Sequence, residues 1–311
     1  MYVLFRKELS DHLDGFRFLI IFIMGMLIAS VSLYSALGGL GAAVAESTTS
    51  NFVFLRLFTA NNGTIPSFAT FIMIVGPLIG LLLGFDAINS ERSGGTLDRL
   101  LAQPIHRDDV INGKFLAGVA VIAILMTSMI LLICGAGLIG MGIPPSGEEV
   151  VRIMVFLFFT IVYTSFWLGL AILLSVICRH AATSVLSVIA IWLIFTFFMS
   201  LIVSGLAGAL FPMDSIEMAE RSLLFQQQFS RISPAVLYTE AISTILDPTT
   251  RILGITSVIQ YEQLYSGVAG ILPLGQSLLL IWPHLVGLIA ESLVIFVISY
   301  IVFMKQEIRG A

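Results

Sequence analysis

Charged side chains are scarce in this sequence. Asp, Glu, Lys and Arg make up 11% of its 311 residues, whereas an ordinary soluble domain contains about 25%. The chain therefore cannot cover a soluble globule with charge, which excludes a soluble enzyme and a disordered regulator. Its two cysteines, Cys134 and Cys178, lie in apolar runs and provide no disulfide framework for a secreted scaffold. With a net charge of -4, the chain has no strongly basic surface, which excludes nucleic acid as a partner.

Long apolar runs are what the sequence does contain, since 58% of its residues are hydrophobic. A helix needs about 20 apolar residues to cross a bilayer, and a charge at its centre costs about 2.5–3.5 kcal/mol. The runs without charge predict an all-α integral membrane protein, a single transmembrane domain over residues 1–311. We expect its six spans at residues 18–40, 66–85, 115–141, 153–178, 181–210 and 278–304.

Three segments outside the spans have patterns of their own. In residues 1–16, apolar side chains recur at helical spacing at Phe5, Leu9, Leu13 and Phe16, which predicts an amphipathic helix on the membrane surface that contacts the lipid bilayer. A simple extension of the first span is the alternative. Residues 86–114 form a loop, and residues 211–277 form a larger segment in which we expect two helices, the second over 234–246.

Basic residues predict which side of the membrane each loop faces. With the N-terminus in the cytoplasm, ten of the 15 Lys and Arg residues lie inside, and three of the rest lie in residues 211–277. Short loops follow the positive-inside rule, and long segments are largely exempt from it. We therefore expect both termini and the loop 86–114 in the cytoplasm, and residues 211–277 outside.

The loop 86–114 carries the most informative pattern. Ser93-Gly94-Gly95 interrupts a helix, and Thr96 is suited to cap the next one, with Asp98 in its first turn. Pro104 ends this short helix. Its apolar stripe consists of Leu97, Leu100 and Leu101. The stripe needs a surface to dock on, which can be the bundle, the lipid or a partner protein.

The same loop resembles the signature of ABC-2 type transporter permeases. The similarity lies in Phe-Asp-Ala-Ile (85–88), Glu-Arg (91–92), Gly-Thr-Leu-x-x-Leu-Leu (95–101), Pro-Ile-x-Arg (104–107) and Gly-Lys-Phe (113–115). It is greatest to the subgroup that includes the permease of the nitrous oxide reductase maturation system. The resemblance extends to the six-helix plan, to Arg-Lys-Glu-Leu at 6–9 and, more weakly, to Ser-Pro-Ala-Val-Leu-Tyr at 233–238.

The resemblance implies a set of partners. In that family two permeases pair, and each inserts this loop as a coupling helix into a separate ATPase subunit. It implies a prokaryotic inner-membrane homodimer with two copies of an ABC ATPase, which bind the ATP and Mg. The matching positions are Glu91, Arg92, Gly95, Thr96, Leu97, Leu100 and Leu101, to which we add Asp98 and Arg99 of the same short helix.

The chain has no ATP-binding motif of its own. Gly113-Lys114 precedes Phe115 where a P-loop requires Ser or Thr, and no glycine stands at the required upstream spacing. We therefore expect no cofactor, no catalytic residue and no enzymatic activity in this chain. Cys178 and His180 lack a third ligand, so no metal site is predicted.

Polar residues in or beside the spans allow more than one interpretation. Glu291 lies within the sixth span, and His284 lies seven residues earlier on the same helical face. They form either an ion, proton or substrate site, or a protonated or hydrogen-bonded contact that fixes helix packing. Glu148, Glu149 and Arg152 resemble a protease motif with the wrong spacing, so we expect a solvated start of the fourth span.

Three functions remain at this point. The first is the permease subunit of an ATP-driven exporter, in which Gly205 and Gly208 permit close helix packing across the dimer. The second is a permease that transmits force to an extracytoplasmic accessory protein. The third is a secondary transporter or channel, which is disfavoured because the sequence has one intramembrane acid and no visible repeat.

Overall fold

The computed structural model describes residues 2–46, 52–61, 63–95, 107–211, 215–248 and 272–305, and the described part contains helices and no strand. In chain order the elements are α1 (Tyr2–Leu13), α2 (Phe16–Glu46), α3 (Arg56–Thr59), α4 (Phe68–Gly84), α5 (Asn89–Ser93), α7 (Arg107–Met141), α8 (Gly147–Ile177), α9 (Ala181–Leu193), the π-helical turn η1 (Ile194–Phe198), α10 (Met199–Leu210), α11 (Ile216–Ser230), α12 (Pro234–Leu246) and α14 (Leu274–Lys305).

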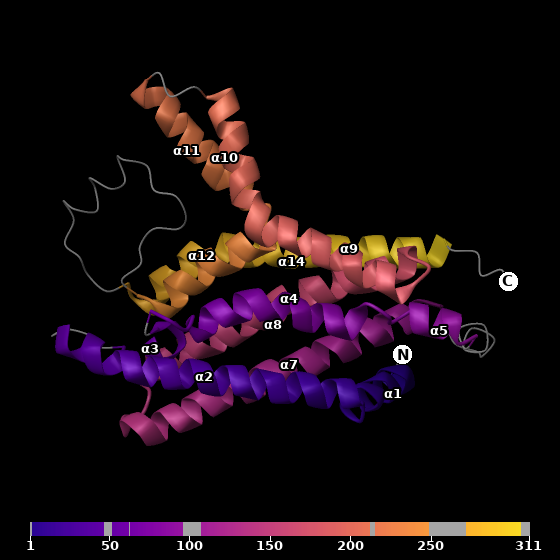
Figure 1. Cartoon of the computed structure of the whole chain (residues 1–311), viewed down its shortest axis with the longest axis horizontal. Helices are drawn as coiled ribbons and strands as arrows, with labels where there is room; N and C mark the ends of the chain where they lie inside the picture. Colours follow the sequence, from indigo (N-terminus) through magenta and orange to yellow (C-terminus); the bar gives the residue numbers. More distant parts are fainter. Residues whose placement is uncertain are drawn as a thin grey trace.

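Six helical stretches of the described chain are long and apolar enough to cross a membrane. They are α2, α4 with α5, α7, α8, the continuous stretch from α9 to α10, and α14. The all-α fold with six spans is thereby confirmed, and the chain is a multi-pass membrane protein. Figure 1 shows the spans packed side by side, with α1 and α5 at one end and α3 at the other. We call these the α5 end and the α3 end of the bundle.

Helix α8 is the centre of the bundle. Of its most apolar window 72% is buried, against 6% for the α9–α10 stretch and 11% for α14. It packs against α4, α7, α12 and α14. Its first turn is closed by a capping box, in which Ser146 accepts from the Glu149 amide and the Glu149 side chain accepts from the Ser146 amide.

Helix α4 lies close to α8 because three glycines share one of its faces. Gly76, Gly80 and Gly84 are spaced four residues apart, so they line up along the contact. A Cβ atom at Gly80 would lie 2.7 Å from the Thr164 carbonyl oxygen. Gly205, for which packing was predicted, has no atom within 4 Å of such a Cβ, and neither has Gly208, among the described residues. Packing of these two glycines across a dimer therefore stays a prediction.

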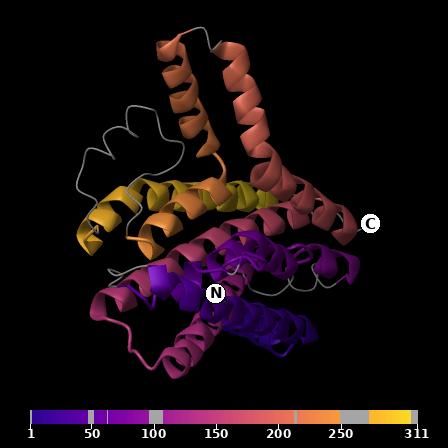
Figure 2. The same ribbon diagram turned by 60° about the vertical axis from the view of Figure 1, so that its left-hand side comes forward.

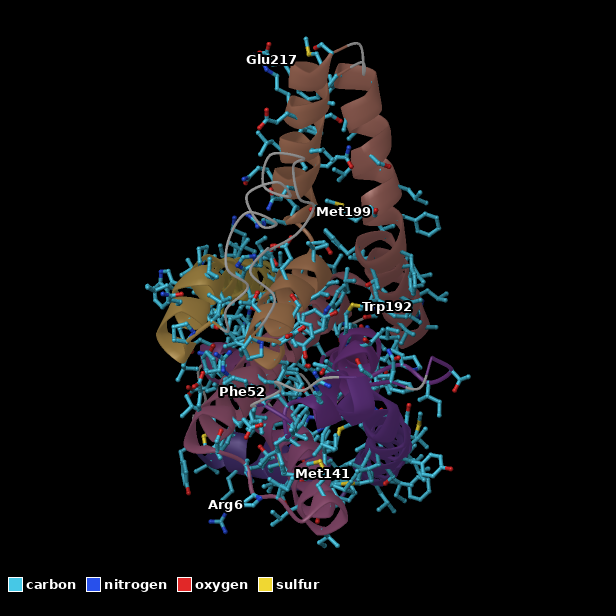
Figure 3. All side chains as sticks on the ribbon, turned by 90° about the vertical axis from the view of Figure 1, so that its left-hand side faces the viewer. Arg6, Phe52, Met141, Trp192, Met199 and Glu217 are labelled. Carbon is cyan, nitrogen blue, oxygen red and sulfur yellow. The ribbon has the colours of Figure 1, made fainter. Side chains whose placement is uncertain are left out.

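The fifth span is helical from Ala181 to Leu210, as predicted, but it bends at η1. A π-helical turn pairs each carbonyl with a more distant amide, which is a recognised cause of sharp kinks. The Ser233 hydroxyl donates to the Phe195 carbonyl in this turn, at 2.8 Å. After the bend, α10 and α11 form a hairpin that stands off the bundle (Figures 1 and 2). Glu217 lies at its far tip (Figure 3).

The start of α8 is buried, so the predicted solvated start of the fourth span is wrong. Arg152 is 0% exposed and Glu149 4%. The Arg152 guanidinium donates to the carbonyl oxygens of Ile245 and Leu272, at 3.1 and 2.8 Å, and also pairs with Glu148. The Glu149 carboxylate accepts from the Phe54 amide at 2.9 Å. These charged groups can be buried because backbone groups of other segments pair with them.

Candidate functional site

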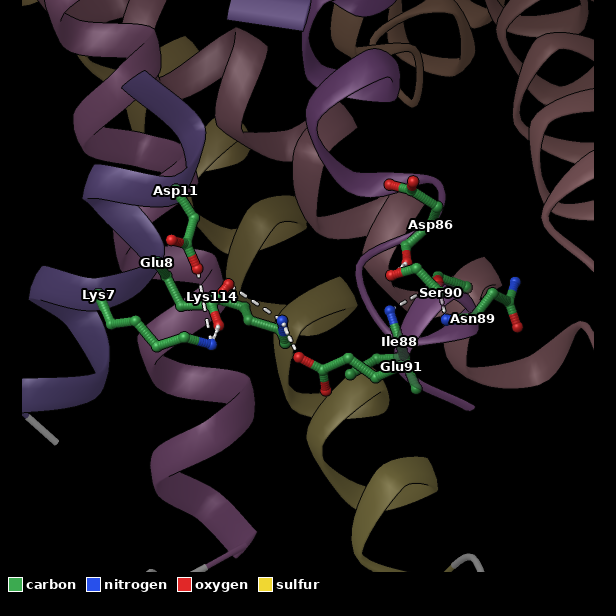
Figure 4. A network of polar contacts seen from close by, with 10 residues as sticks. Lys7, Glu8, Asp11, Asp86, Ile88, Asn89, Ser90, Glu91 and Lys114 are labelled. Atoms are coloured by element: carbon green, nitrogen blue, oxygen red, sulfur yellow. Dashed lines mark hydrogen bonds and ion pairs between the residues drawn. The ribbon is translucent and has the colours of Figure 1, made fainter. Parts of the chain in front are cut away.

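A buried lysine joins three elements at the α5 end of the bundle. Lys114, near the start of α7, lies 3.0 Å from a carboxylate oxygen of Glu8 on α1 and 2.8 Å from one of Glu91 on α5. Figure 4 shows its ammonium group between the two acids. The three side chains are 7%, 9% and 15% exposed, respectively. We call Lys114, Glu8 and Glu91 the lysine junction.

Close packing of α1 on α7 brings Glu8 to this place. Leu4 is buried against Gly113, where an added Cβ atom would lie 3.3 Å from the leucine side chain. Glu8 follows Leu4 by four residues, so it lies on the same helical face, one turn further along. Phe16, the last residue of the predicted apolar face, begins α2 and is 74% exposed, so the lipid contact of this face stays a prediction.

Hydrogen bonds to α8 hold α5 in position. The Ser175 hydroxyl oxygen accepts from the backbone amides of Ile88 and Asn89, at 3.0 and 3.2 Å. Helix α5 then ends at Ser93, and Gly95 adopts a positive φ of 64°. A positive φ is readily available to glycine, which explains the predicted break at 93–95. The loop therefore leaves the bundle from a fixed starting point.

A second ion pair and a cavity adjoin the lysine junction. Arg17, at the start of α2, pairs with Asp86, which follows α4, and lies over the Phe85 ring. A cavity of about 430 Å³ is lined by this pair together with Lys114 and Glu8. His12 also lines it. Burial lowers the pKa of His12 below its ordinary value of 6.5, although the negative charges of Glu8 and Asp86 oppose the shift.

The predicted loop residues are only partly covered by the structure. Glu91 belongs to the lysine junction, Arg92 is exposed on α5, and Gly95 ends the described part of the loop. The rest of the predicted ATPase contact lies outside the described residues: Thr96, Leu97, Asp98, Arg99, Leu100 and Leu101. Its short helix stays a prediction.

His284 and Glu291 have different surroundings. Nε2 of His284 lies 2.7 Å from Oε2 of Glu240 on α12, and the Arg231 side chain donates to the same oxygen at 2.9 Å. Oε2 of Glu291 is buried and makes no hydrogen bond within the described residues. The two predicted residues therefore share a helix without sharing a partner, and both interpretations of Glu291 stay open.

Pairing of Glu8 with Lys114 could not be predicted from the sequence. They are 106 residues apart, and nothing local in either motif specifies the other. The one available signal was that each charge lies beside an apolar run. That position is equally typical of a charge that anchors a helix at the membrane interface without any pairing. No cluster of three or more His, Cys, Asp or Glu side chains suited to a metal occurs in the described part.

This geometry suits mechanical transmission. The loop starts on α5, and α5 is fixed to α7 and α1 by an ion-paired lysine and to α8 by hydrogen bonds. Comparison with known proteins now identifies the family. The profile of the ABC-2 family transporter protein matches residues 2–308. The chain belongs to the ABC-2 family.

Two curated bacterial proteins are similar to part of this ABC-2 chain. Both are described as a probable ABC transporter permease protein NosY, one from Pseudomonas aeruginosa and one from Stutzerimonas stutzeri. The identities are 37% and 36% over 119 residues. The matched stretch spans 38% of this chain and 38% of each relative.

Proposed function

We propose that the chain is the membrane subunit of an ATP-driven exporter, in which separate ATPase subunits bind ATP and Mg²⁺. Membership of the ABC-2 family supports the class of machine. The lysine junction is the observation that carries the proposal, because it connects the start of the predicted coupling loop to the span α7 and to α1. The α5 end then faces the cytoplasm, with both chain termini, in a prokaryotic inner membrane.

In this proposal, ATP binding moves the coupling loop, and the bundle follows as a rigid body. Glu91 passes the displacement to Lys114 on α7 and, through it, to Glu8 on α1. Ser175 passes it to α8, which is the most buried span. Packed helices shift between discrete arrangements more readily than they deform. A small movement of the coupling loop can therefore displace the α3 end of the bundle.

We further propose that two copies of the chain form the transport unit, with one ATPase bound to each. Support comes from the outer faces of the bundle. The α9–α10 stretch and α14 are apolar but barely buried within one chain. The α10–α11 hairpin projects sideways from the bundle and offers a further surface that a second copy can contact (Figure 2).

A second function fits one specific observation. The α10–α11 hairpin exposes charged side chains such as Glu217 and Arg221 away from the bundle. Such a surface can push on an extracytoplasmic accessory protein, so that the permease transmits force and no substrate crosses. Transport by vesicles that lack the accessory protein supports the exporter, whereas ATP-dependent action only on the accessory protein supports the alternative.

Co-purification tests the proposed ATPase contact. We expect the chain to retain an ABC ATPase, and Leu97→Asp or Arg99→Glu to release it. Arg6→Glu, an exposed charge reversal on α1, is the control and keeps the ATPase. Retention by all three variants would contradict the coupling role of the loop, and ion or substrate flux that needs no ATPase would favour the secondary transporter.

A further inference from the structure

The cavity beside the lysine junction is lined by two kinds of side chain. Charged groups come from α1, from the start of α2, from α7 and from the turn after α4, and apolar groups come mainly from the spans. The charged lining consists of Glu8, Asp11, Arg17, Asp86 and Lys114. Its volume of about 430 Å³ is within the range of small-molecule sites. This lining suits a ligand with a charged end and an apolar continuation.

The apolar part of the lining places the cavity beside the lipid. Phe16 is 74% exposed and Leu82 is 44% exposed, and both line the cavity. Exposed apolar side chains on membrane-spanning helices require hydrocarbon around them. The cavity therefore straddles the boundary between acyl chains and headgroups, which is where the phosphate and the amine of a phospholipid lie.

The charges of the lining select the headgroup. Lys114 is already held by Glu8 and Glu91. Arg17 uses Nη1 for Asp86 and makes no other hydrogen bond within the described residues, so Nε and Nη2 remain as donors to a phosphate. Asp11 is 62% exposed and has only a 3.6 Å contact with Lys7. Arg17 thus offers donors to an anion, while Asp11 and Asp86 offer acceptors to a cation.

We propose that this cavity binds the headgroup of a phospholipid that carries a primary amine, such as phosphatidylethanolamine. Its phosphate accepts from Arg17, and its ammonium donates to Asp11 and Asp86. Phosphatidylglycerol has no cation for the carboxylates and would be repelled by them. Phosphatidylcholine has no N–H to donate, so its hydrogen bonds to the carboxylates are lost.

Native mass spectrometry of the purified full-length chain tests this. The protein in detergent is incubated with phosphatidylethanolamine, phosphatidylcholine and phosphatidylglycerol of the same acyl chains. We expect selective retention of phosphatidylethanolamine. Arg17→Gln and Asp11→Asn should each weaken its binding about five- to tenfold, as expected for a partly exposed charge-assisted hydrogen bond.

Two exposed charges, one on α1 and one just after its end, provide matched controls. Arg6→Gln and Asp14→Asn remove one charge each outside the cavity lining, and should leave lipid retention unchanged. Size-exclusion profiles establish that all four variants are folded. Equal loss in the controls, or equal retention of the three lipids, would overturn the proposal.

The soluble headgroup separates a lipid from a cytosolic ligand. Glycerophosphoethanolamine presents the same phosphate and amine without acyl chains, and we expect it to bind far more weakly than the lipid. Binding as tight as that of the lipid would overturn the lipid assignment. None of these measurements involves an ATPase, so their outcome is independent of the proposed transport function.

Discussion

Two buried cations, one at each end of the bundle, show what single residues contribute to this protein. Lys114 binds the carboxylates of two other elements, and Arg152 binds backbone carbonyls of segments that come much later in the chain. Removing a charge from water is costly unless every such group finds partners. Each cation therefore makes a local arrangement of helices specific, because other arrangements would leave it unpaired.

The lysine junction can be tested by removing its cation. Lys114→Met removes the buried ammonium group that lies between Glu8 and Glu91, so we expect a loss of about 3–5 kcal/mol in the free energy of unfolding. The measurement is the apparent Tm in detergent. Glu8→Gln in the same chain should restore part of the loss, and Lys114→Arg should retain most of the stability. An unchanged Tm for Lys114→Met would show that the junction is not needed for stability.

Arg152 gives a parallel test at the α3 end. Arg152→Met leaves Glu148 and the carbonyls of Ile245 and Leu272 without their donor, and should cost about 3–5 kcal/mol. The control is Arg221→Met on α11, where the arginine is 59% exposed and pairs with Glu217. Exposed pairs contribute at most about 1 kcal/mol, so the control Tm should barely move. Similar shifts in both variants would contradict the structural role of Arg152.

At the scale of helices, the spans were predictable and their contacts were not. Bilayer thickness fixes how long a charge-free run must be, so composition alone located six spans. Bilayer thickness does not determine which apolar face of a span packs against another helix, because lipid and protein are equally apolar surroundings. The glycine face of α4 was missed for this reason. The bend at η1 was missed because the bond from Ser233 to Phe195 joins residues 38 positions apart.

The close contact of α4 with α8 can be tested by adding one methyl group. Gly80→Ala brings a Cβ atom within 2.7 Å of the Thr164 carbonyl oxygen and 2.8 Å of the Leu168 amide nitrogen. Backbone atoms cannot move aside cheaply, so we expect a loss of about 1–3 kcal/mol, read as a lower Tm. Gly135→Ala on α7, which has no neighbour within 4 Å, is the control. It should be neutral or slightly stabilising, because alanine favours helix.

One side chain from outside the fifth span forms a hydrogen bond to its bend. Ser233→Ala removes the hydroxyl that donates to the Phe195 carbonyl, so the orientation of the α10–α11 hairpin should become more variable. Spin labels at Leu186 on α9 and Arg221 on α11, both exposed, report their distance distribution. We expect a broader distribution than in the parent. Ser204→Ala, whose hydroxyl bonds only within α10, is the control.

For the whole molecule, burial is distributed unevenly over the six spans. Helix α8 is enclosed, whereas the α9–α10 stretch and α14 present apolar faces outward. The comparisons establish the family over residues 2–308, but neither they nor the sequence determine which outward faces meet lipid and which meet protein. A single sequence cannot separate these, because both surroundings select the same apolar residues.

A larger side chain at a glycine of α10 tests the proposed pairing of two chains. A Cβ atom at Gly205 would have no atom of the described residues within 4 Å, so we expect the monomer of Gly205→Leu to keep its Tm. If α10 packs against a second copy, the leucine should weaken the dimer by about 1–3 kcal/mol, which raises its dissociation constant roughly 5- to 150-fold. Light scattering during size exclusion measures the mass. Gly135→Leu on α7 is the control, and an unchanged dimer in both variants would exclude α10 from the interface.

The position of Arg152 also constrains how the protein is made. Its acceptors Ile245, Leu272 and Ser277 lie 93, 120 and 125 residues further along the chain. At about 5–20 residues per second, the ribosome needs roughly 6–25 s to reach the last of them. During that interval the guanidinium must stay hydrated, so the start of α8 cannot settle in its final place. Completion of this end of the protein therefore waits for the last span to emerge.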